Sequence, residues 1–318
     1  MEMDIDLVVF WEDDTDIDYM RLKSVYRRNK DSVQRDIYEK HVFKDKENLR
    51  YFLRSVEKHL KFIRNIFIIT NYELPSWINV CDRRIKPLSY RTIIPFNILP
   101  TFNYSVIENF LVNIPDLSDR FLYVSENSFF VRDVKRSFFF NDKGYPYIRF
   151  KNFFPLQKEL EDKENIAVKN AIELSYKYFG KKPRFFKHCN IEAFYKPDIV
   201  NCLEKIDKDI KNTVYNKFPD DDDVSRYIWT YYAYYNNHAE FRYPSWHQLT
   251  NTVKFFAQYF YKFVKDTQEI KLSQKRYMVL SKTKMISFEK DFDADEDDEK
   301  RALNFLQNKF PEKSCYEI

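Results

Sequence analysis

The chain has 318 residues, of which 44% are hydrophobic and 32% charged, and this composition indicates a globular protein with one main domain and an elaboration. Its net charge of +4 comes from interspersed basic and acidic residues, whereas nucleic-acid-binding proteins usually show a concentrated basic face. The two glycines, Gly144 and Gly180, are too few and too far apart for a Walker loop or a dinucleotide fingerprint.

The cysteines and histidines argue against structural zinc, because the four cysteines form no C-x-x-C pair and the five histidines form no H-E-x-x-H motif. Reduced thiols in a cytoplasmic compartment are the ordinary explanation of such cysteines. The first residues lack the basic and apolar regions of a signal peptide, and no run of roughly 18 apolar residues occurs. We therefore expect a cytoplasmic protein without a membrane-spanning helix.

The first half of the chain alternates strand and helix patterns. Residues 5–10, I-D-L-V-V-F, are rich in β-branched and aromatic side chains and predict a buried strand. Apolar residues from Leu49 to Leu60 lie on one helical face, and Asp45 is available as the N-cap. Further strands are predicted at 66–70, 84–88 and 120–124. This alternation predicts an α/β fold with a mostly parallel sheet and flanking helices.

Helical patterns become more frequent further along the chain. Residues 101–111 predict a helix, with Ser105 and Glu108 at capping-box spacing. The acidic run from Asp220 to Asp223 is typical of a solvated loop. After about residue 150, helices are predicted at 161–179, 197–212 and 298–309.

Residues 226–264 are strongly aromatic, and the spacing of their rings predicts two packed helices. Core packing is favoured over a membrane-facing surface, because aromatic stripes at helical spacing are usually buried. We predict that residues 1–150 form an α/β core that carries the functional site. Residues 151–318 then form a largely helical, aromatic-rich continuation that completes the site within one integrated domain.

Polar side chains follow the predicted strand at 120–124, where Ser125, Glu126 and Asn127 come directly after the apolar run. Open α/β sheets bind their ligands at the carboxyl ends of their strands. This segment is therefore the best candidate for the functional site.

Clustered carboxylates also follow the first predicted strand, in the sequence W-E-D-D-T-D-I-D. Carboxylates gathered at a strand end can hold a hard divalent cation, although a solvated acidic turn explains the same residues. Arg50 and Arg54 suit phosphate recognition, or equally ion pairs on the surface. His188 suits proton transfer near neutral pH, or a structural role.

Taken together, ordered blocks of sequence resemble the Stealth family of sugar-1-phosphate transferases. That family includes bacterial capsular and exopolysaccharide phosphotransferases and the eukaryotic enzyme that makes the lysosomal mannose-6-phosphate tag. The opening I-D-L-V-V-F-W-E-D-D-T-D resembles its first block, and L-R-Y-F-L-R-S-V-E-K-H through I-P-D-L-S-D-R-F-L-Y resembles its second. His188 falls where the third block has its histidine, and F-D-A-D-E-D-D followed by N-K-F-P-E-K-S looks like the fourth.

The resemblance implies a nucleotide-sugar-binding sheet and a reaction in which a UDP-sugar passes sugar-1-phosphate to an acceptor hydroxyl, with Mg²⁺ or Mn²⁺ as cofactor. The acceptor would be a glycan or lipid-linked glycan of a capsule or other surface polysaccharide, reached at the inner face of the membrane. The implied catalytic residues are His188, Glu126 and Asp13. The implied metal ligands are Asp13, Asp16, Glu126 and Asp291. The implied nucleotide- and substrate-binding residues are Arg50, Arg54, Asn71, Asn103, Asn127 and Lys217.

The chain also departs from the family pattern, and each departure removes or moves a charge. The usual Asn-Asp-Asp after the strand is Ser-Glu-Asn, which places Glu126 and Asn127 where aspartates are expected. Asn48 replaces the glutamate before Leu-Arg, while Pro219 and Lys290 occupy other polar positions of the pattern. These changes keep two alternatives open. One is a partner or scaffold in glycan assembly that has lost catalysis, and the other is a glycosyltransferase that releases UDP.

Overall fold

The computed structural model describes residues 3–12, 16–27, 47–148, 150–153, 166–183, 185–187, 191–241, 267–274, 276–279, 283–290 and 293–318. Several predicted features lie outside these residues, namely the N-cap at Asp45, the second aromatic helix, and the site candidates Asp13, His188 and Asp291.

A five-stranded sheet in the order β3-β2-β1-β4-β9 forms the centre of the molecule. Its strands are β1 (Ile5–Phe10), β2 (Ile63–Ile69), β3 (Ile85–Leu88), β4 (Arg120–Ser125) and β9 (Ile191–Tyr195). The first four strands run parallel, and β9 runs antiparallel to β4. The predicted α/β fold with a mostly parallel sheet is therefore confirmed.

Both faces of this sheet are covered, which explains why the central strands read as continuous apolar runs. All six residues of β1 are buried. Because side chains alternate along a strand, Leu7 and Val9 join one core cluster, while Val8 and Phe10 join the other. Two separate cores thus sandwich the sheet.

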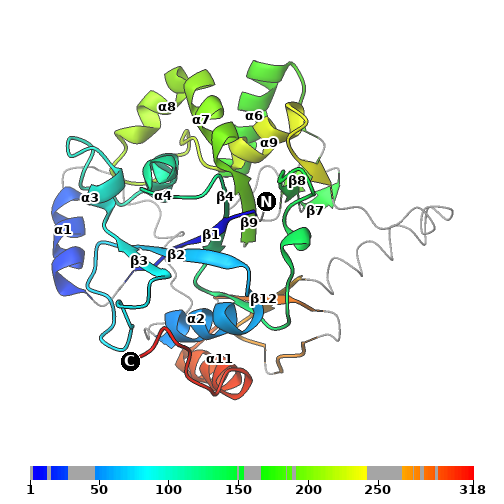
Figure 1. Cartoon of the computed structure of the whole chain (residues 1–318). Helices are drawn as coiled ribbons and strands as arrows, with labels where there is room; N and C mark the ends of the chain where they lie inside the picture. The colour runs from blue at the N-terminus through cyan, green and yellow to red at the C-terminus, as the bar shows by residue number, and fades with distance from the viewer. Residues whose placement is uncertain are drawn as a thin grey trace.

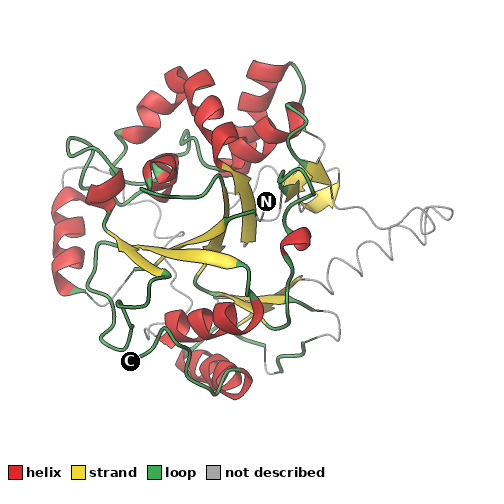
Figure 2. Ribbon diagram, in the orientation of Figure 1, coloured by secondary structure: helices red, strands yellow, loops and turns green. Residues whose placement is uncertain are grey.

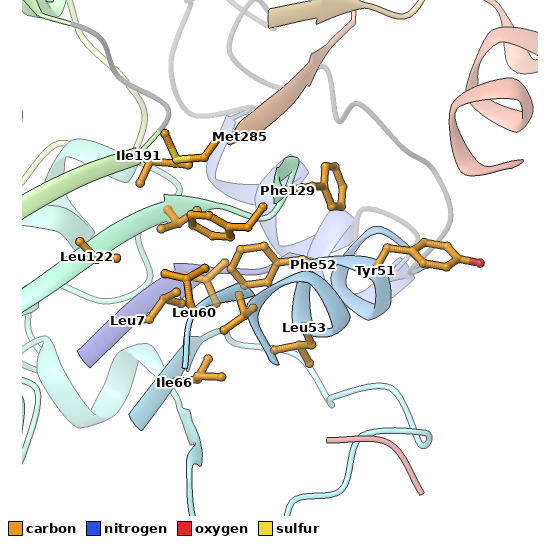
Figure 3. Close-up of a cluster of buried hydrophobic side chains, with 14 of the residues drawn as sticks. Leu7, Tyr51, Phe52, Leu53, Leu60, Ile66, Leu122, Phe129, Ile191 and Met285 are labelled. Carbon is orange, nitrogen blue, oxygen red and sulfur yellow. The ribbon is translucent and has the colours of Figure 1, made fainter. Parts of the chain in front are cut away.

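On one face, α2 (Glu47–His59) packs an apolar stripe against the sheet. Figure 3 shows Phe52 of this helix between Leu122 of β4 and Phe129 of β5. Helix α11 (Glu296–Lys309) lies beside α2 and completes this layer, as Figure 1 shows.

The opposite face carries a group of helices that pack on β4 and β9, seen at the top of Figure 1. The helices on this face, including the short ones, are α4 (Tyr104–Asn109), η2 (Leu111–Asn113), α6 (Ile166–Phe179), α7 (Lys196–Lys205), α8 (Asp207–Val214) and α9 (Tyr227–Tyr235). Helix α1 (Ile17–Arg27) and the single-turn helix α3 (Tyr90–Ile93) lie near the carboxyl ends of the parallel strands, and η3 (Arg136–Phe138) follows β5.

Three smaller sheets surround the central one, drawn in yellow in Figure 2. Their strands are β5 (Ser128–Phe130), β6 (Tyr147–Ile148), β7 (Phe150–Phe153), β8 (Phe185–Lys187), β10 (Glu240–Phe241), β11 (Thr267–Lys271) and β12 (Met285–Glu289). They pair as β11-β12-β5, β10-β6 and β7-β8.

Three local predictions were wrong. No capping box forms at Ser105, because α4 starts after Asn103, whose side-chain oxygen accepts from the Ser105 N–H at 3.0 Å. The helix predicted at 197–212 breaks into α7 and α8 at Ile206. The acidic run is not wholly solvated, since Asp223 is 4% exposed and accepts hydrogen bonds from neighbouring amides.

Within the described part of the chain, no helix is long and apolar enough to cross a membrane.

Candidate active site at the carboxyl edge of the sheet

Four parallel strands end at the same edge of the sheet, and each delivers polar side chains there. Glu12 follows β1, Asn71 follows β2, Tyr90 follows β3, and Glu126 follows β4. Because β1 and β4 are adjacent, their glutamates approach each other although 114 positions separate them in the sequence. This edge is where α/β sheets bind their ligands.

Of the predicted site residues that the structure describes, Glu126 has the most strongly shifted pKa. The pKa of its carboxyl is raised to about 7, first by burial and also by the nearby charge of Glu12. A backbone hydrogen bond opposes this rise only in part. A carboxyl that titrates near neutral pH is suited to proton transfer, or to binding a cation that would offset its charge.

Tyrosine hydroxyls surround Glu12. Tyr90 donates a hydrogen bond to Glu12 Oε1 at 3.0 Å. Burial raises the pKa of Tyr90, Tyr104 and Tyr72, and in each case the carboxylate of Glu12 adds to the effect. These phenols therefore remain protonated at neutral pH, where they can donate hydrogen bonds to carboxylate or phosphate oxygens.

An aromatic wall borders this group of carboxyls and phenols. Tyr19 of α1 packs edge-on against Tyr72 and Phe102, with ring centroids 5.0 and 5.4 Å apart. Trp11, directly before Glu12, packs on Tyr72 at 6.2 Å. Such rings shield the edge from water, which strengthens the electrostatic interactions of the carboxyls behind them.

Two of the departures from the family pattern meet in space. The side-chain amide of Asn48, in the first turn of α2, donates to Asn127 Oδ1 at 3.1 Å. The amide of Asn127 in turn donates to Glu126 Oε1 at 3.4 Å. A pair of neutral amides therefore stands beside Glu126, and neither adds a charge to the site.

Asn71 and Asn103 act on the backbone. Asn71 Oδ1 accepts from the Tyr90 N–H at 3.2 Å and so fixes the turn that begins α3. Asn103 caps α4 and donates to Asp223 Oδ2 at 2.7 Å. Lys217 donates to the carbonyl of Ile98 at 2.6 Å, and burial lowers its pKa.

The two arginines of α2 contact the C-terminal segment. Arg54 makes a bidentate ion pair with Glu317, with Nε–Oε1 and Nη2–Oε2 distances of 2.7 and 2.8 Å. Arg50 pairs with Glu47 at 2.7 Å and lies over the ring of Trp77 at 4.7 Å. Both guanidinium groups already have carboxylate partners.

A divalent cation fits the donor set at this edge only in part. Asp16 Oδ1 accepts from the N–H groups of Asp18 and Tyr19 at 2.9 and 3.0 Å, which makes it the cap of α1. No group of three or more metal-binding side chains forms among the described residues. Two carboxylates, Glu12 and Glu126, suffice for Mg²⁺ when water and substrate phosphates complete the coordination.

Sequence reasoning missed Glu12. It is the first acidic residue after β1, within a run of carboxylates, but the predicted ligands were the aspartates that follow it. Its place one residue beyond Trp11, at the end of a fully buried strand, is the signal that could have identified it.

Comparisons with known proteins match the part of the chain that forms β2, β3 and β4 of this sheet. A family model described as "Stealth protein CR2, conserved region 2" matches residues 42–148. Residues 42–148 therefore contain a conserved region of the Stealth family. The matched region includes α2, β2, β3 and β4, and with them Asn48, Asn71 and Glu126.

Three proteins similar to this chain are named capsular polysaccharide phosphotransferases. The capsular polysaccharide phosphotransferase eps5J of Streptococcus thermophilus is 34% identical over 140 residues, covering 44% of this chain and 59% of the relative. The capsular polysaccharide phosphotransferase fcs1 of Haemophilus influenzae is 32% identical over 181 residues, 56% of this chain and 50% of the relative. SacB of Neisseria meningitidis serogroup A, also a capsular polysaccharide phosphotransferase, is 28% identical over 74% of this chain and 44% of its own length. The chain spans about half the length of the curated relatives that it matches.

Among solved structures, a crystal structure of an active-site mutant of LgtC covers 98% of both chains at 10% identity. The two structures superpose with a TM-score of 0.45.

Proposed function

We propose that this chain transfers sugar-1-phosphate from a UDP-sugar to a hydroxyl of a glycan in the assembly of a capsular or other surface polysaccharide. The observation that carries the proposal is the pair Glu12 and Glu126, two neighbouring carboxyls at the carboxyl edge of the sheet, of which Glu126 lies within the region that matches the family model. The similar proteins named capsular polysaccharide phosphotransferases support the transfer of a phosphate-containing group.

In this proposal, Glu12 and Glu126 would hold Mg²⁺ or Mn²⁺ against the diphosphate of the donor. A bound divalent cation supplies charge stabilisation for the phosphoryl group. The phenols of Tyr90 and Tyr104 would orient the carboxylates, and the aromatic wall would exclude water from the transfer. His188 stays a predicted acid or base, and the glycan or lipid-linked acceptor stays a predicted partner.

The test is incubation of the protein with UDP-sugars, Mg²⁺ or Mn²⁺ and capsule-type oligosaccharide acceptors, followed by separation of the nucleotide products. Release of UMP with gain of a phosphodiester-linked sugar is expected, and Glu126→Gln should abolish it. Glu173→Gln is the matched control, since Glu173 lies on α6 and is exposed beside Lys182. Release of UDP would establish ordinary glycosyl transfer and reject the proposed reaction.

The contact between Asn48 and Asn127 favours a second candidate, a family member that binds partners or glycans without catalysis. Two amides in contact next to Glu126 leave the site with fewer charges than the family pattern implies. Calorimetric titration of the nucleotide-sugar with and without Mn²⁺ distinguishes the candidates. Tight binding that requires the metal ion contradicts the non-catalytic one.

A further inference from the structure

A second set of chemically active side chains lies at the other end of the sheet from Glu126. Because β9 runs antiparallel to β4, its last residue pairs with Arg120, the first residue of β4. Helix α7 starts directly after β9 and carries Asp198 in its first turn. A small cavity lies between β9, α7, α9 and the segment from Phe139 to Ile148.

Asp198 and Trp229 are among the residues that line this cavity, and their buried atoms Oδ2 and Nε1 have no hydrogen-bond partner within the described part of the chain. The two residues are 3% and 1% exposed. Leaving a buried donor or acceptor without a hydrogen-bond partner destabilises the folded state. One is an acceptor and the other a donor, so a single group with both properties would satisfy them together.

Asp198 also orients a histidine at the edge of the cavity. Its other carboxylate oxygen, Oδ1, lies 2.7 Å from His238 Nδ1 and so holds the imidazole in place. The imidazole stacks on the ring of Tyr145, with centroids 4.5 Å apart, and Tyr195 lies edge-on to it. Half-buried aromatic rings thus border the opening.

The chemistry of the cavity selects a neutral hydroxyl. A hydroxyl can accept from Trp229 Nε1 and donate to Asp198 Oδ2 at once, whereas a phosphate or carboxylate would meet the Asp198 charge. The space, about 30 Å³, holds one or two water molecules or one hydroxymethyl group. Aromatic rings beside a few fixed polar groups are the ordinary lining of a site for a small organic ligand.

We propose that this cavity, with Asp198, Trp229 and His238, is a carbohydrate-binding site separate from the carboxylate edge. One sugar hydroxyl enters the cavity between Asp198 and Trp229, and the sugar ring lies against Tyr145 and Tyr195. The site concerns binding alone and does not depend on the proposed transfer reaction.

The experiment follows the indole N–H resonances of the four tryptophans in a ¹⁵N–¹H spectrum during titration. The probes are methyl glycosides of glucose, galactose and N-acetylglucosamine. The Trp229 resonance, assigned with Trp229→Phe, should shift saturably with at least one glycoside while the other three stay unmoved. Asp198→Asn should weaken that binding about tenfold or more, because it replaces the acceptor.

Controls keep the outcome clear. Trp229→Phe keeps an aromatic ring but removes the N–H together with the five-membered ring of the buried indole, so its thermal unfolding is measured beside its affinity for the glycoside, which should fall in the folded protein. Trp77→Phe, on the α2 side of the molecule, should leave affinity unchanged. An unmoved Trp229 resonance with every glycoside, or equal affinity in Asp198→Asn, rejects the proposal and assigns the cavity to water. UMP release by the same preparations reports separately on the carboxylate edge.

Discussion

Two groups of carboxylates in this molecule, one on a helix-covered face and one at the carboxyl edge of the sheet, differ in how their charge is balanced. On the face covered by α4 and α9, Glu108 and Glu192 both contact the guanidinium of Arg226, and the Glu192 Oε2–Arg226 Nε distance is 2.5 Å. Tyr123 donates to Glu108 at 3.2 Å. Burial alone would lower the pKa of Arg226, but the two carboxylates raise it well above its usual value.

At the carboxyl edge, Glu12 and Glu126 have phenol and amide neighbours instead. Among the described residues, no arginine or lysine contributes to the pKa of Glu126, which is raised to about 7 chiefly by burial. The difference teaches that the Arg226 group is built to hold the fold together. The edge is built with an excess of negative charge that a ligand or proton can neutralise, as functional sites often are.

The largest expected loss of stability comes from replacing Arg226, the cation that balances Glu108 and Glu192. Arg226→Met leaves Glu108 and Glu192 buried without their partner and should lower the free energy of unfolding by about 3–5 kcal/mol. Urea denaturation measures this loss. Adding Glu108→Gln and Glu192→Gln should recover most of the lost stability. A triple variant as unstable as Arg226→Met would show that Arg226 does not stabilise the fold by balancing these two charges.

Neutralising Glu126 at the carboxyl edge should raise the free energy of unfolding instead of lowering it. The folded pKa of Glu126 is raised, so the native state binds its proton more tightly, and stability declines as pH rises from about 4.5 to about 7. Glu126→Gln should remove this decline and raise the free energy of unfolding at pH 8 by about 2 kcal/mol, after a discount for partial exposure. Urea denaturation from pH 4.5 to 8 in EDTA measures it. A variant that is less stable at pH 8 contradicts the assigned environment.

Asp223, a buried carboxylate outside both groups, sharpens the comparison, because amides rather than a cation satisfy it. Asp223 accepts from Asn103 at 2.7 Å and from Asn216 at 2.8 Å. Asn103→Ala should cost about 2 kcal/mol by removing one of these bonds and the cap of α4. Thermal unfolding checks this value. A variant with unchanged stability but weaker nucleotide-sugar binding would assign Asn103 to the ligand instead.

The smallest effect is expected from Asn127→Asp, which adds a negative charge beside Glu126. The two carboxylates should raise each other's pKa and lower stability at pH 8 by about 1 kcal/mol, less if a cation binds. The measurement is urea denaturation with and without Mn²⁺. A stability loss that Mn²⁺ reverses indicates that the added charge strengthens a metal site, and a gain in UMP release indicates that the parent site has lost activity.

Much of the fold follows from local patterns that the sequence displays. The strand predicted at 5–10 matches β1, because a strand covered on both faces must be apolar throughout. The predicted strands at 84–88 and 120–124 and the helix beginning near Leu49 also correspond to β3, β4 and α2.

The site was less predictable, because its contacts join residues far apart in the chain. Glu126 follows from its strand-end position, but its contact through Asn127 with Asn48 spans 79 positions. Composition could not show that Asp223 is buried, because an acidic run looks solvated until distant amides reach it. Such pairings are fixed by tertiary packing and not by any local pattern.

The ion pair between Arg54 and Glu317 also affects the order in which the chain can fold during synthesis. Arg54 Nη1 donates to the carbonyl of Phe310 as well, at 2.8 Å, so α2 is held by residues made more than 250 positions later. Until the ribosome has released Glu317, the outer side of α2 lacks these contacts. The helix that positions Asn48 beside Glu126 is therefore completed late, after the sheet it covers has been synthesised.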